Sequence, residues 1–179
     1  MIKTTLKPKK CKICKEKFTP WNSLQVTCSP SCALIDAKEK TEKKRKKEHR
    51  ERKQGLKTKS QWLKEAQVEF NKYIRSRDHT RPCVSCGRYH SGQNHAGHYR
   101  SVGAAPELRF NEDNCHLQCA PCNNHKSGNA IEYRINLVKK IGLKRVEILE
   151  GKHEPKHYTI DDIKEIKRVY REKCKELAR

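Results

Sequence analysis

Cysteines at metal-ligand spacing are the first residues in this sequence that could do chemistry. Eight of the ten cysteines form two sets of four, each made of two closely spaced pairs: Cys11, Cys14, Cys28 and Cys32, then Cys83, Cys86, Cys119 and Cys122. Four thiolates on two short turns match a tetrahedral structural zinc site, which leaves no coordination position open for a substrate. We therefore predict two structural Zn2+ ions in the chain, one at each set.

Free thiols and redox pairs are the alternatives to zinc. Free thiols at this density would be a large oxidation risk, and the CxxC pairs lack the βαβ pattern that surrounds a redox motif. In the second set Cys115 competes with Cys119, but Cys119 repeats the CxxC spacing with Cys122. We expect Cys115 and Cys174 to be small buried hydrophobic residues.

The insert between the two pairs of the second set carries a second kind of chemistry. In and just after it lie His95, His98, Asn114 and Asn123. Hydrolysis of a phosphodiester needs an activated water, a cation on the phosphate and donors for the leaving oxygen. Histidine supplies a base near neutral pH, and His or Asn can give a divalent ion one or two ligands while it keeps its waters.

An amphipathic helix is expected before this insert. It has Ser60 as its N-cap, and Arg81-Pro82 stops it. Its apolar stripe consists of Trp62, Ala66, Phe70 and Ile74. Residues 83–130 show little periodicity, so we expect short strands and loops arranged around ligands.

Two more helices are expected after the insert. One spans 131–141 and is closed by Gly142. The last begins at Thr159, with Asp162 three residues later as a capping partner. Its stripe consists of Ile163, Ile166, Tyr170 and Leu177.

The net charge is +21, from 42 Lys and Arg against 21 Asp and Glu. Such a charge indicates a polyanionic partner, of which nucleic acid is the usual one and an acidic membrane surface the main rival. No apolar run approaches the ~18–20 residues that span a bilayer, and the N-terminus lacks the apolar core of a signal peptide. We expect a cytoplasmic protein that does not enter a membrane.

A basic arm from 38 to 53 holds ten Lys or Arg, four Glu and no apolar residue. It cannot bury a face, so we predict a solvated helix or a disordered arm that Gly55 ends. The arm is either a simple spacer or a clamp for the DNA backbone, which gives affinity without base reading. Its densest positions are Lys43, Lys44, Arg45, Lys46 and Lys47.

The order CxxC, Gly-His, Asn and CxxC-Asn resembles the zinc-braced HNH nucleases, which include the Holliday-junction resolvase endonuclease VII. Three runs, 96–100, 108–112 and 118–129, resemble the NinG (Rap) recombination nucleases of lambdoid phages. The order of the parts, a cysteine cluster, then a basic arm, then the helix that contains Trp62, also resembles this family. The resemblance covers nearly the whole chain. Its motifs in 83–129 are highly specific.

The resemblance implies a small α+β fold: a ββα-metal (HNH) core braced by a four-cysteine zinc and flanked by helices, with an N-terminal four-cysteine zinc module. The parts would be a zinc-binding module (1–35), a basic helical or disordered linker (36–59) and an HNH-like nuclease domain with flanking helices (60–179). Only 34% of the residues are hydrophobic, which agrees with small cores that need metal to be stable.

The resemblance also implies roles for single residues. His98 matches the general base, Asn114 the residue that orients the hairpin and its histidine, and Asn123 a ligand of the catalytic Mg2+ or Mn2+. In many HNH enzymes an acidic residue precedes the base and is the second ligand, but Gly97 stands there in this sequence. We predict that His95 substitutes for it.

Each residue also has a plainer interpretation. His98 could bond a backbone group, Asn114 and Asn123 could bind their own backbone in loops, and His95 could be solvated.

Side chains around these residues could also touch DNA. Arg100 and Lys126 are candidates for phosphate contacts, although most such residues are only solvated. We expect support roles for His116 and His125.

Together these expectations favour a structure-specific endonuclease that cuts branched recombination intermediates such as Holliday junctions and D-loops. The alternative is a non-catalytic zinc protein that binds nucleic acid in recombination or regulation. The set His98, Asn114 and Asn123 discriminates, because a pure binder has no reason to carry it at HNH spacing.

A homodimer is the expected assembly, because a two-fold dimer can present one active site to each of two opposed strands. The stripes of the 62–74 helix and the last helix could form its interface, or they could cover the core instead. Other recombination proteins are further expected partners.

Overall fold

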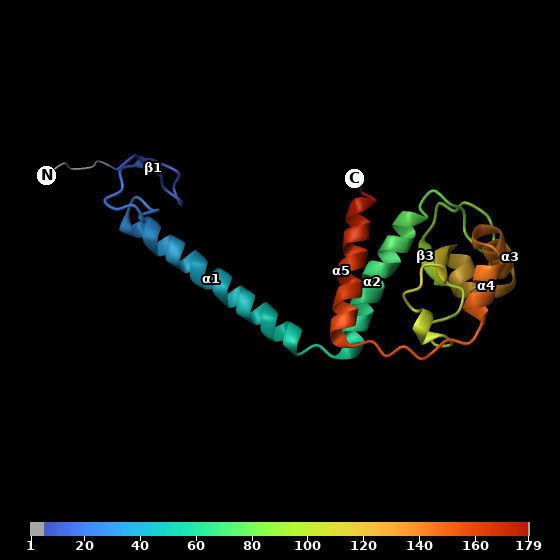
Figure 1. Cartoon of the computed structure of the whole chain (residues 1–179). Helices are drawn as coiled ribbons and strands as arrows, with labels where there is room; N and C mark the ends of the chain where they lie inside the picture. The colour runs from blue at the N-terminus through green and yellow to red at the C-terminus, as the bar shows by residue number, and fades with distance from the viewer. Residues whose placement is uncertain (1–5, 179) are drawn as a thin grey trace. The chain divides into compact units, whose positions relative to one another are not determined.

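A computed structural model describes residues 6–178 of the chain (Figure 1). It contains two compact units that meet between Lys57 and Thr58. They are described separately below as the N-terminal unit and the C-terminal unit. No helix in the described residues is long and apolar enough to cross a membrane.

The N-terminal unit consists of a small hairpin and one long helix. Strands β1 (Lys9–Lys10) and β2 (Lys17–Phe18) pair antiparallel, and helix α1 spans Pro30–Gly55. The Ser29 side chain accepts a hydrogen bond from the Cys32 amide, and Pro30 stands in the first helical turn, which tolerates a missing N–H. The helix start therefore carries one of the predicted cysteine ligands.

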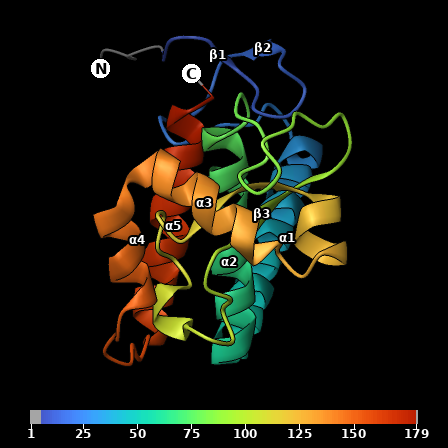
Figure 2. The same cartoon turned by 90° about the vertical axis from the view of Figure 1, so that its right-hand side faces the viewer.

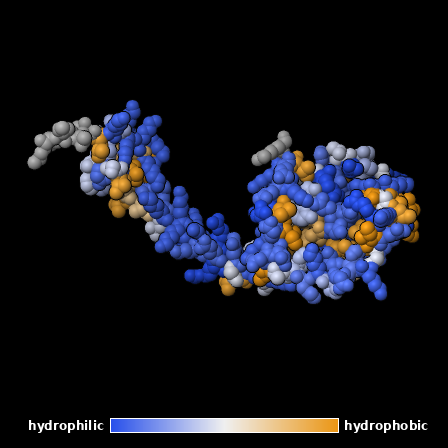
Figure 3. All heavy atoms as spheres, in the orientation of Figure 1, coloured by the Kyte–Doolittle hydropathy of each residue, from blue (hydrophilic) through white to orange (hydrophobic). Residues whose placement is uncertain are grey.

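Most of α1 is a solvated helix, one of the two states expected for the basic arm, and it ends at Gly55 as predicted. Every residue from 38 to 55 is exposed, and Figure 3 shows this part of the helix as almost uniformly hydrophilic. Ion pairs four residues apart, such as Lys46 with Glu42 at 2.7 Å, support the helix without any packed face.

The C-terminal unit begins with helix α2 (Lys59–Arg77). Its N-cap is Thr58, not Ser60, because Thr58 and Gln61 complete a capping box with each other. The helix ends four residues before the predicted stop at Arg81, and Asp78 is its C-cap. The predicted stripe is correct: Trp62, Ala66, Phe70 and Ile74 are all buried.

Helix α5 (Ile160–Glu176) lies beside α2 (Figure 1). The predicted capping box of Thr159 and Asp162 is present. Apolar residues of both helices share common cores, and the Lys167–Glu65 pair at 2.6 Å ties the helices at their surface. Most of the two stripes proposed as a dimer interface is therefore already buried against the other helix and the hairpin within one chain, whereas Leu177, just past the end of α5, is 52% exposed.

The centre of the C-terminal unit is the antiparallel hairpin of β3 (Asn94–His98) and β4 (Cys115–Cys119). Short helices η1 (Pro106–Leu108) and η2 (Pro121–His125) flank β4. Helices α3 (Ala130–Ile141) and α4 (Leu143–Glu150) follow and face the viewer in Figure 2.

Helices lie on both faces of this hairpin. On one face Ala96 and Cys115 pack with Phe70 of α2 and Tyr170 of α5. On the other face the Tyr133 hydroxyl of α3 donates to the Gly97 carbonyl at 2.9 Å. Because successive strand residues point to opposite faces, neighbouring candidate residues on β3 are sent to different sides.

Candidate functional site

The first cysteine set gathers around the start of α1. The sulfurs of Cys11, Cys14, Cys28 and Cys32 all lie within 4.8 Å of one another. Cys14 is 3.5 Å from Cys28, and Cys28 is 3.8 Å from Cys32. Sulfurs bound at ~2.3 Å to a tetrahedral zinc are about 3.8 Å apart. The set thus has the spacing of a zinc site, and its cysteines form no disulfide.

The pKa values in this set indicate what a bound cation would change. Burial raises the pKa of Cys11, but backbone amides of Cys28, Cys14 and Ile13 outweigh burial and lower it to about 6. The pKa of Cys28 is raised to about 12, chiefly because it lies beside Cys14. A divalent cation would remove the repulsion that keeps the later thiols protonated.

The second cysteine set lies where β4 enters η2. Its sulfurs, those of Cys83, Cys86, Cys119 and Cys122, are also within 4.8 Å of one another, and three of the four residues are fully buried. The Cys119 amide donates to the Cys83 sulfur at 3.3 Å. Cys115 does not join the set, and it is a buried thiol as expected, as is Cys174. The chain therefore has two cysteine clusters that could hold zinc.

His90 is a residue that the sequence analysis missed. Its Nε2 lies 3.3 Å from the Cys86 sulfur. A ring N–H there supports a thiolate ligand from outside the first coordination shell. The signal was present in the sequence, because His90 follows Cys86 by four residues.

His95 and Asn123 are brought together as predicted. Asn123 Nδ2 lies 3.0 Å from His95 Nδ1 and donates to Asn124 Oδ1 at 2.9 Å. The second cysteine cluster fixes this arrangement, because Asn123 directly follows Cys122 and His95 is one strand residue from Asn94, which pairs with Cys119. The two side chains come from segments 28 residues apart.

The 3.0 Å contact joins His95 Nδ1 to the NH2 group of Asn123, which binds no metal, so the atoms left to bind a divalent ion are His95 Nε2 and Asn123 Oδ1. Within residues 6–178, His95 Nε2 is buried and has no hydrogen-bond partner, and Asn123 Oδ1 accepts no hydrogen bond. The only described groups of three or more His, Cys, Asp or Glu residues that could hold a metal are the two four-cysteine sets. An ion here would therefore keep waters or take oxygens from a phosphate, as Mg2+ commonly does.

His98 lies on the other face of the hairpin. Its Nε2 donates to the Arg109 carbonyl at 2.9 Å, and its Nδ1 is 3.7 Å from the Cys115 sulfur. The ring stacks near Phe70, with 6.0 Å between centroids. Burial lowers the pKa of His98, so the ring is neutral at pH 7. Its contact with a backbone carbonyl is the plainer role that the sequence allowed, and the structure does not bring it to Asn123.

Asn114 holds the loop that joins the two strands. It is fully buried, accepts from the Arg100 amide at 2.8 Å and donates to the Arg100 carbonyl at 2.9 Å. A further bond reaches the Leu108 carbonyl at 3.3 Å. These contacts orient the end of β3, where His98 stands.

Gly97 and Gln118 explain the missing acidic residue before His98. A Cβ at Gly97 would lie 2.0 Å from Gln118 Oε1. Gln118 is fully buried, and its Nε2 donates to Ser85 Oγ at 2.6 Å and to the Gly128 carbonyl at 2.5 Å. The space that an aspartate would use is thus occupied by a fixed glutamine.

A buried carboxylate organises the same unit and was not foreseen. Asp78 is 2% exposed and accepts from the Leu117 amide at 3.2 Å and from Lys140 at 3.1 Å. Burial disfavours its charge, but His116, Arg77 and Lys140 outweigh burial and hold its pKa well below the usual range. His116 is buried, with only 3% of its surface exposed, and belongs to this network, so it has the expected support role.

The predicted DNA contacts are spread over the chain. Lys126 and His125 are exposed just after the cysteine cluster, whereas Arg100 is half-buried and bonds the Glu150 carbonyl at 3.4 Å. The five basic positions 43–47 are all exposed on α1. Among the described residues Lys43 has no ion pair, and Arg45 has none either but lies near enough to Glu42 for its charge to help lower the pKa of Glu42.

Comparison with known proteins identifies the family. The family model described as "Bacteriophage Lambda NinG protein" matches residues 3–179. Protein ninG of Escherichia phage 933W is 42% identical over 94% of this chain and 93% of its own length. Protein ninG of Escherichia phage lambda is 42% identical over 92% and 89%, and that of Salmonella phage P22 is 40% identical over 99% and 96%. No solved structure matches the chain. The chain therefore belongs to the NinG family of lambdoid phages.

Proposed function

We propose that this chain is a metal-dependent endonuclease that cuts branched DNA such as Holliday junctions and D-loops. The observation that carries the proposal is the meeting of His95 and Asn123 at 3.0 Å beside a buried four-cysteine cluster. The net charge of +21 supplies the affinity for a polyanion. The hairpin followed by η2 and α3 has the element order of a ββα-metal core, which supports the HNH assignment.

Each part of the site has a proposed role. Asn123 and His95 would hold Mg2+ or Mn2+, which would stabilise charge on the phosphate and lower the pKa of a bound water. Asn114 fixes the loop, and Lys126 is placed to neutralise phosphate nearby. His98 is the base that the family resemblance implies, but it lies on the hairpin face opposite His95 and Asn123, with Nε2 donating to the Arg109 carbonyl and Nδ1 beside the Cys115 sulfur, so this role requires the end of β3 to rearrange when DNA binds.

A non-catalytic nucleic-acid-binding zinc protein is the second candidate. The observation that favours it is the state of His98, since both ring nitrogens already contact protein atoms. In that case the four-cysteine clusters and the basic helix would be the functional parts. His98 would then only hold the end of β3 in place.

Incubation with labelled substrates separates the two functions. The zinc-loaded chain is mixed with a four-way junction, a D-loop and a linear duplex, with and without Mg2+ or Mn2+. We expect divalent-dependent nicks at the branch. The variants His95→Ala and Asn123→Ala should raise the ion concentration required, while His125→Ala, an exposed neighbour, should not. Binding without cleavage under every ion would establish the second candidate.

The remaining proposals concern the setting. A homodimer would place one site on each of two opposed strands of a junction, through a surface other than the two buried stripes. Other recombination proteins are proposed partners, and the cytoplasm of the infected host is the proposed location. Sedimentation of the chain alone and on a junction tests the dimer.

A further inference from the structure

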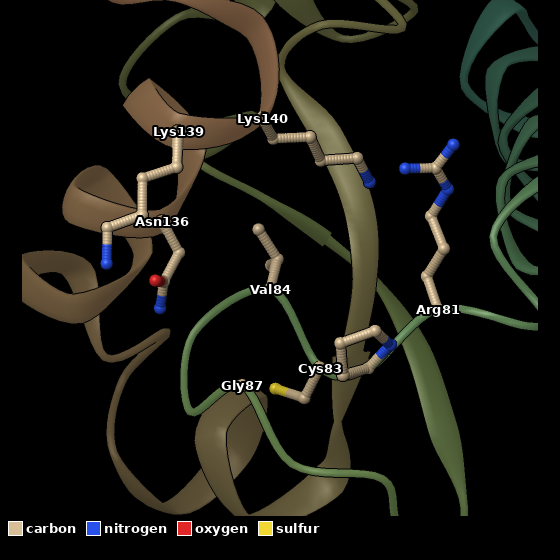
Figure 4. A pocket seen from close by; sticks show the side chains of 8 residues that line it. Arg81, Cys83, Val84, Gly87, Asn136, Lys139 and Lys140 are labelled. Carbon is tan, nitrogen blue, oxygen red and sulfur yellow. The ribbon is translucent and has the colours of Figure 1, made fainter.

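A cavity of about 280 Å³ lies between the turn that follows Cys83 and helix α3. It is lined by Arg81, Pro82, Cys83, Val84, Gly87, Asn136, Lys139 and Lys140. Figure 4 shows Arg81 and Lys140 reaching toward each other from two elements, with Val84 below Lys140 and the α3 side chains Asn136 and Lys139 on the side away from Arg81. The volume lies just below the usual range for drug-sized ligands, so it suits a small group.

The cavity carries an excess of positive charge. Three cations line it, Arg81, Lys139 and Lys140, and two of them contact a carboxylate: Asp78 lies 3.1 Å from Lys140 and 4.0 Å from Arg81. In the described part of the chain the Lys139 side chain has no ion pair or hydrogen bond, and the Arg81 side chain has only that long contact. Three positive charges against one negative leave about +2 at the rim.

The C-terminus of α3 offers a simpler reason for two of these cations. Lysines in a last turn complement the helix dipole, which places about half a negative charge there. That half charge is small against the excess of about +2, and it does not account for Arg81, which lies outside any helix. A surplus therefore remains for an external anion.

The rest of the lining limits what the anion carries. Pro82 and Val84 supply apolar lining to the same cavity, and the Asn136 side-chain amide donates to the Ser85 carbonyl at 2.9 Å. An anion with an apolar neighbour fits this combination better than a bare ion. A nucleic-acid backbone presents such a pair in each phosphate and its sugar.

We propose that this cavity binds one backbone phosphate of a nucleic acid, with the adjoining sugar on Pro82 and Val84. The site is distinct from the His95–Asn123 pair, because it is lined by the second half of α3 and by the turn that follows Cys83. It rests on the proposed function only for the nature of the ligand and requires no cleavage. It adds a contact that would hold one arm of a branched substrate.

The test measures binding to a labelled four-way junction without added divalent ion, over a range of salt. The full zinc-loaded chain carries Arg81→Ala with Lys139→Ala, and the control carries Lys144→Ala with Lys152→Ala. All four side chains are exposed, so both variants should fold and both lose two charges. Loss of one phosphate contact should make the plot of the logarithm of the association constant against the logarithm of the salt concentration less steep by about 0.9. At 0.1 M salt this corresponds to a loss of affinity of about eightfold.

A second arm uses inorganic phosphate and follows the amide signals of Gly87 and Lys139 by NMR. The proposal predicts shifts at both amides in wild type, none in the double variant, and a salt slope that the control leaves unchanged. Equal slopes for the two double variants would overturn it. Phosphate shifts without any slope change would overturn the nucleic-acid assignment and indicate a small phosphorylated ligand. Failure of cleavage with the slope change intact would refute the endonuclease proposal alone.

Discussion

The substitution Gly97→Ala tests how tightly the centre of the hairpin is built. A methyl group there would lie 2.0 Å from Gln118 Oε1, 2.9 Å from its Cδ and 3.0 Å from its Cβ. Gln118 can yield only by leaving Ser85 and the Gly128 carbonyl, to which its Nε2 donates. The new methyl therefore forces either a steric overlap or the loss of buried hydrogen bonds.

The expected cost follows from these two terms. Overpacking a filled core costs about 1–3 kcal/mol, and buried polar groups left without partners cost about 1–3 kcal/mol. Because the methyl forces one of these two losses, we expect Gly97→Ala to lower the free energy of unfolding by roughly 1–3 kcal/mol. Gly103→Ala is the matched control, because no atom lies within 4 Å of its new Cβ, and it should stay within about 0.5 kcal/mol of wild type.

Urea unfolding followed by tryptophan fluorescence measures this cost. Trp62 is 7% exposed in the C-terminal unit and Trp21 is 81% exposed in the other, so the change in emission reports the unit that holds Gly97. The double variant Gly97→Ala with Gln118→Ala should lose less than the sum of the single losses, because the overlapping atoms are gone. Equal stability of the two glycine variants, or strictly additive losses, would refute the close contact.

Three further predictions address metal, charge and catalysis. Metal analysis should find two zinc ions per chain, one for each four-cysteine cluster, and a single zinc would contradict this assignment. Because structural zinc supplies folding free energy, Cys119→Ala should unfold the C-terminal unit. Cys11→Ala should leave that unit folded, as reported by the fluorescence of Trp62. The pKa of Asp78 is depressed, so its stabilisation is complete above about pH 5, begins to fall as pH drops below the unfolded value of ~3.9, and is lost only as pH falls through the much lower folded pKa. Asp78→Asn should therefore cost about 3–5 kcal/mol at pH 7 and flatten the decline of stability in acid, and an unchanged decline would count against the network. His98→Ala should slow cleavage by about 10²–10⁴-fold with junction binding retained if His98 is the base, whereas unchanged cleavage would remove that role.

Local patterns were enough to predict much of the chain. The cysteine spacings, the stripe of Trp62 to Ile74 and the Thr159–Asp162 capping box each lie within a short segment, so their geometry follows from turn and helix periodicity. Helix ends were less certain. Thr58 and Ser60 are both good N-caps, and only the partner Gln61 selects Thr58.

The candidate site depended on contacts that no short segment contains. His95 meets Asn123 across 28 residues, Gln118 fills the space over Gly97, and Lys140 reaches Asp78 across 62 residues. His95 and His98 were predicted to act together, but strand alternation sends them to opposite faces once β3 pairs with β4. The sequence alone determined which residues could bind metal and form helices. Only the tertiary structure decided which side chains share a face, because that follows from strand pairing and from the helices packed on each side.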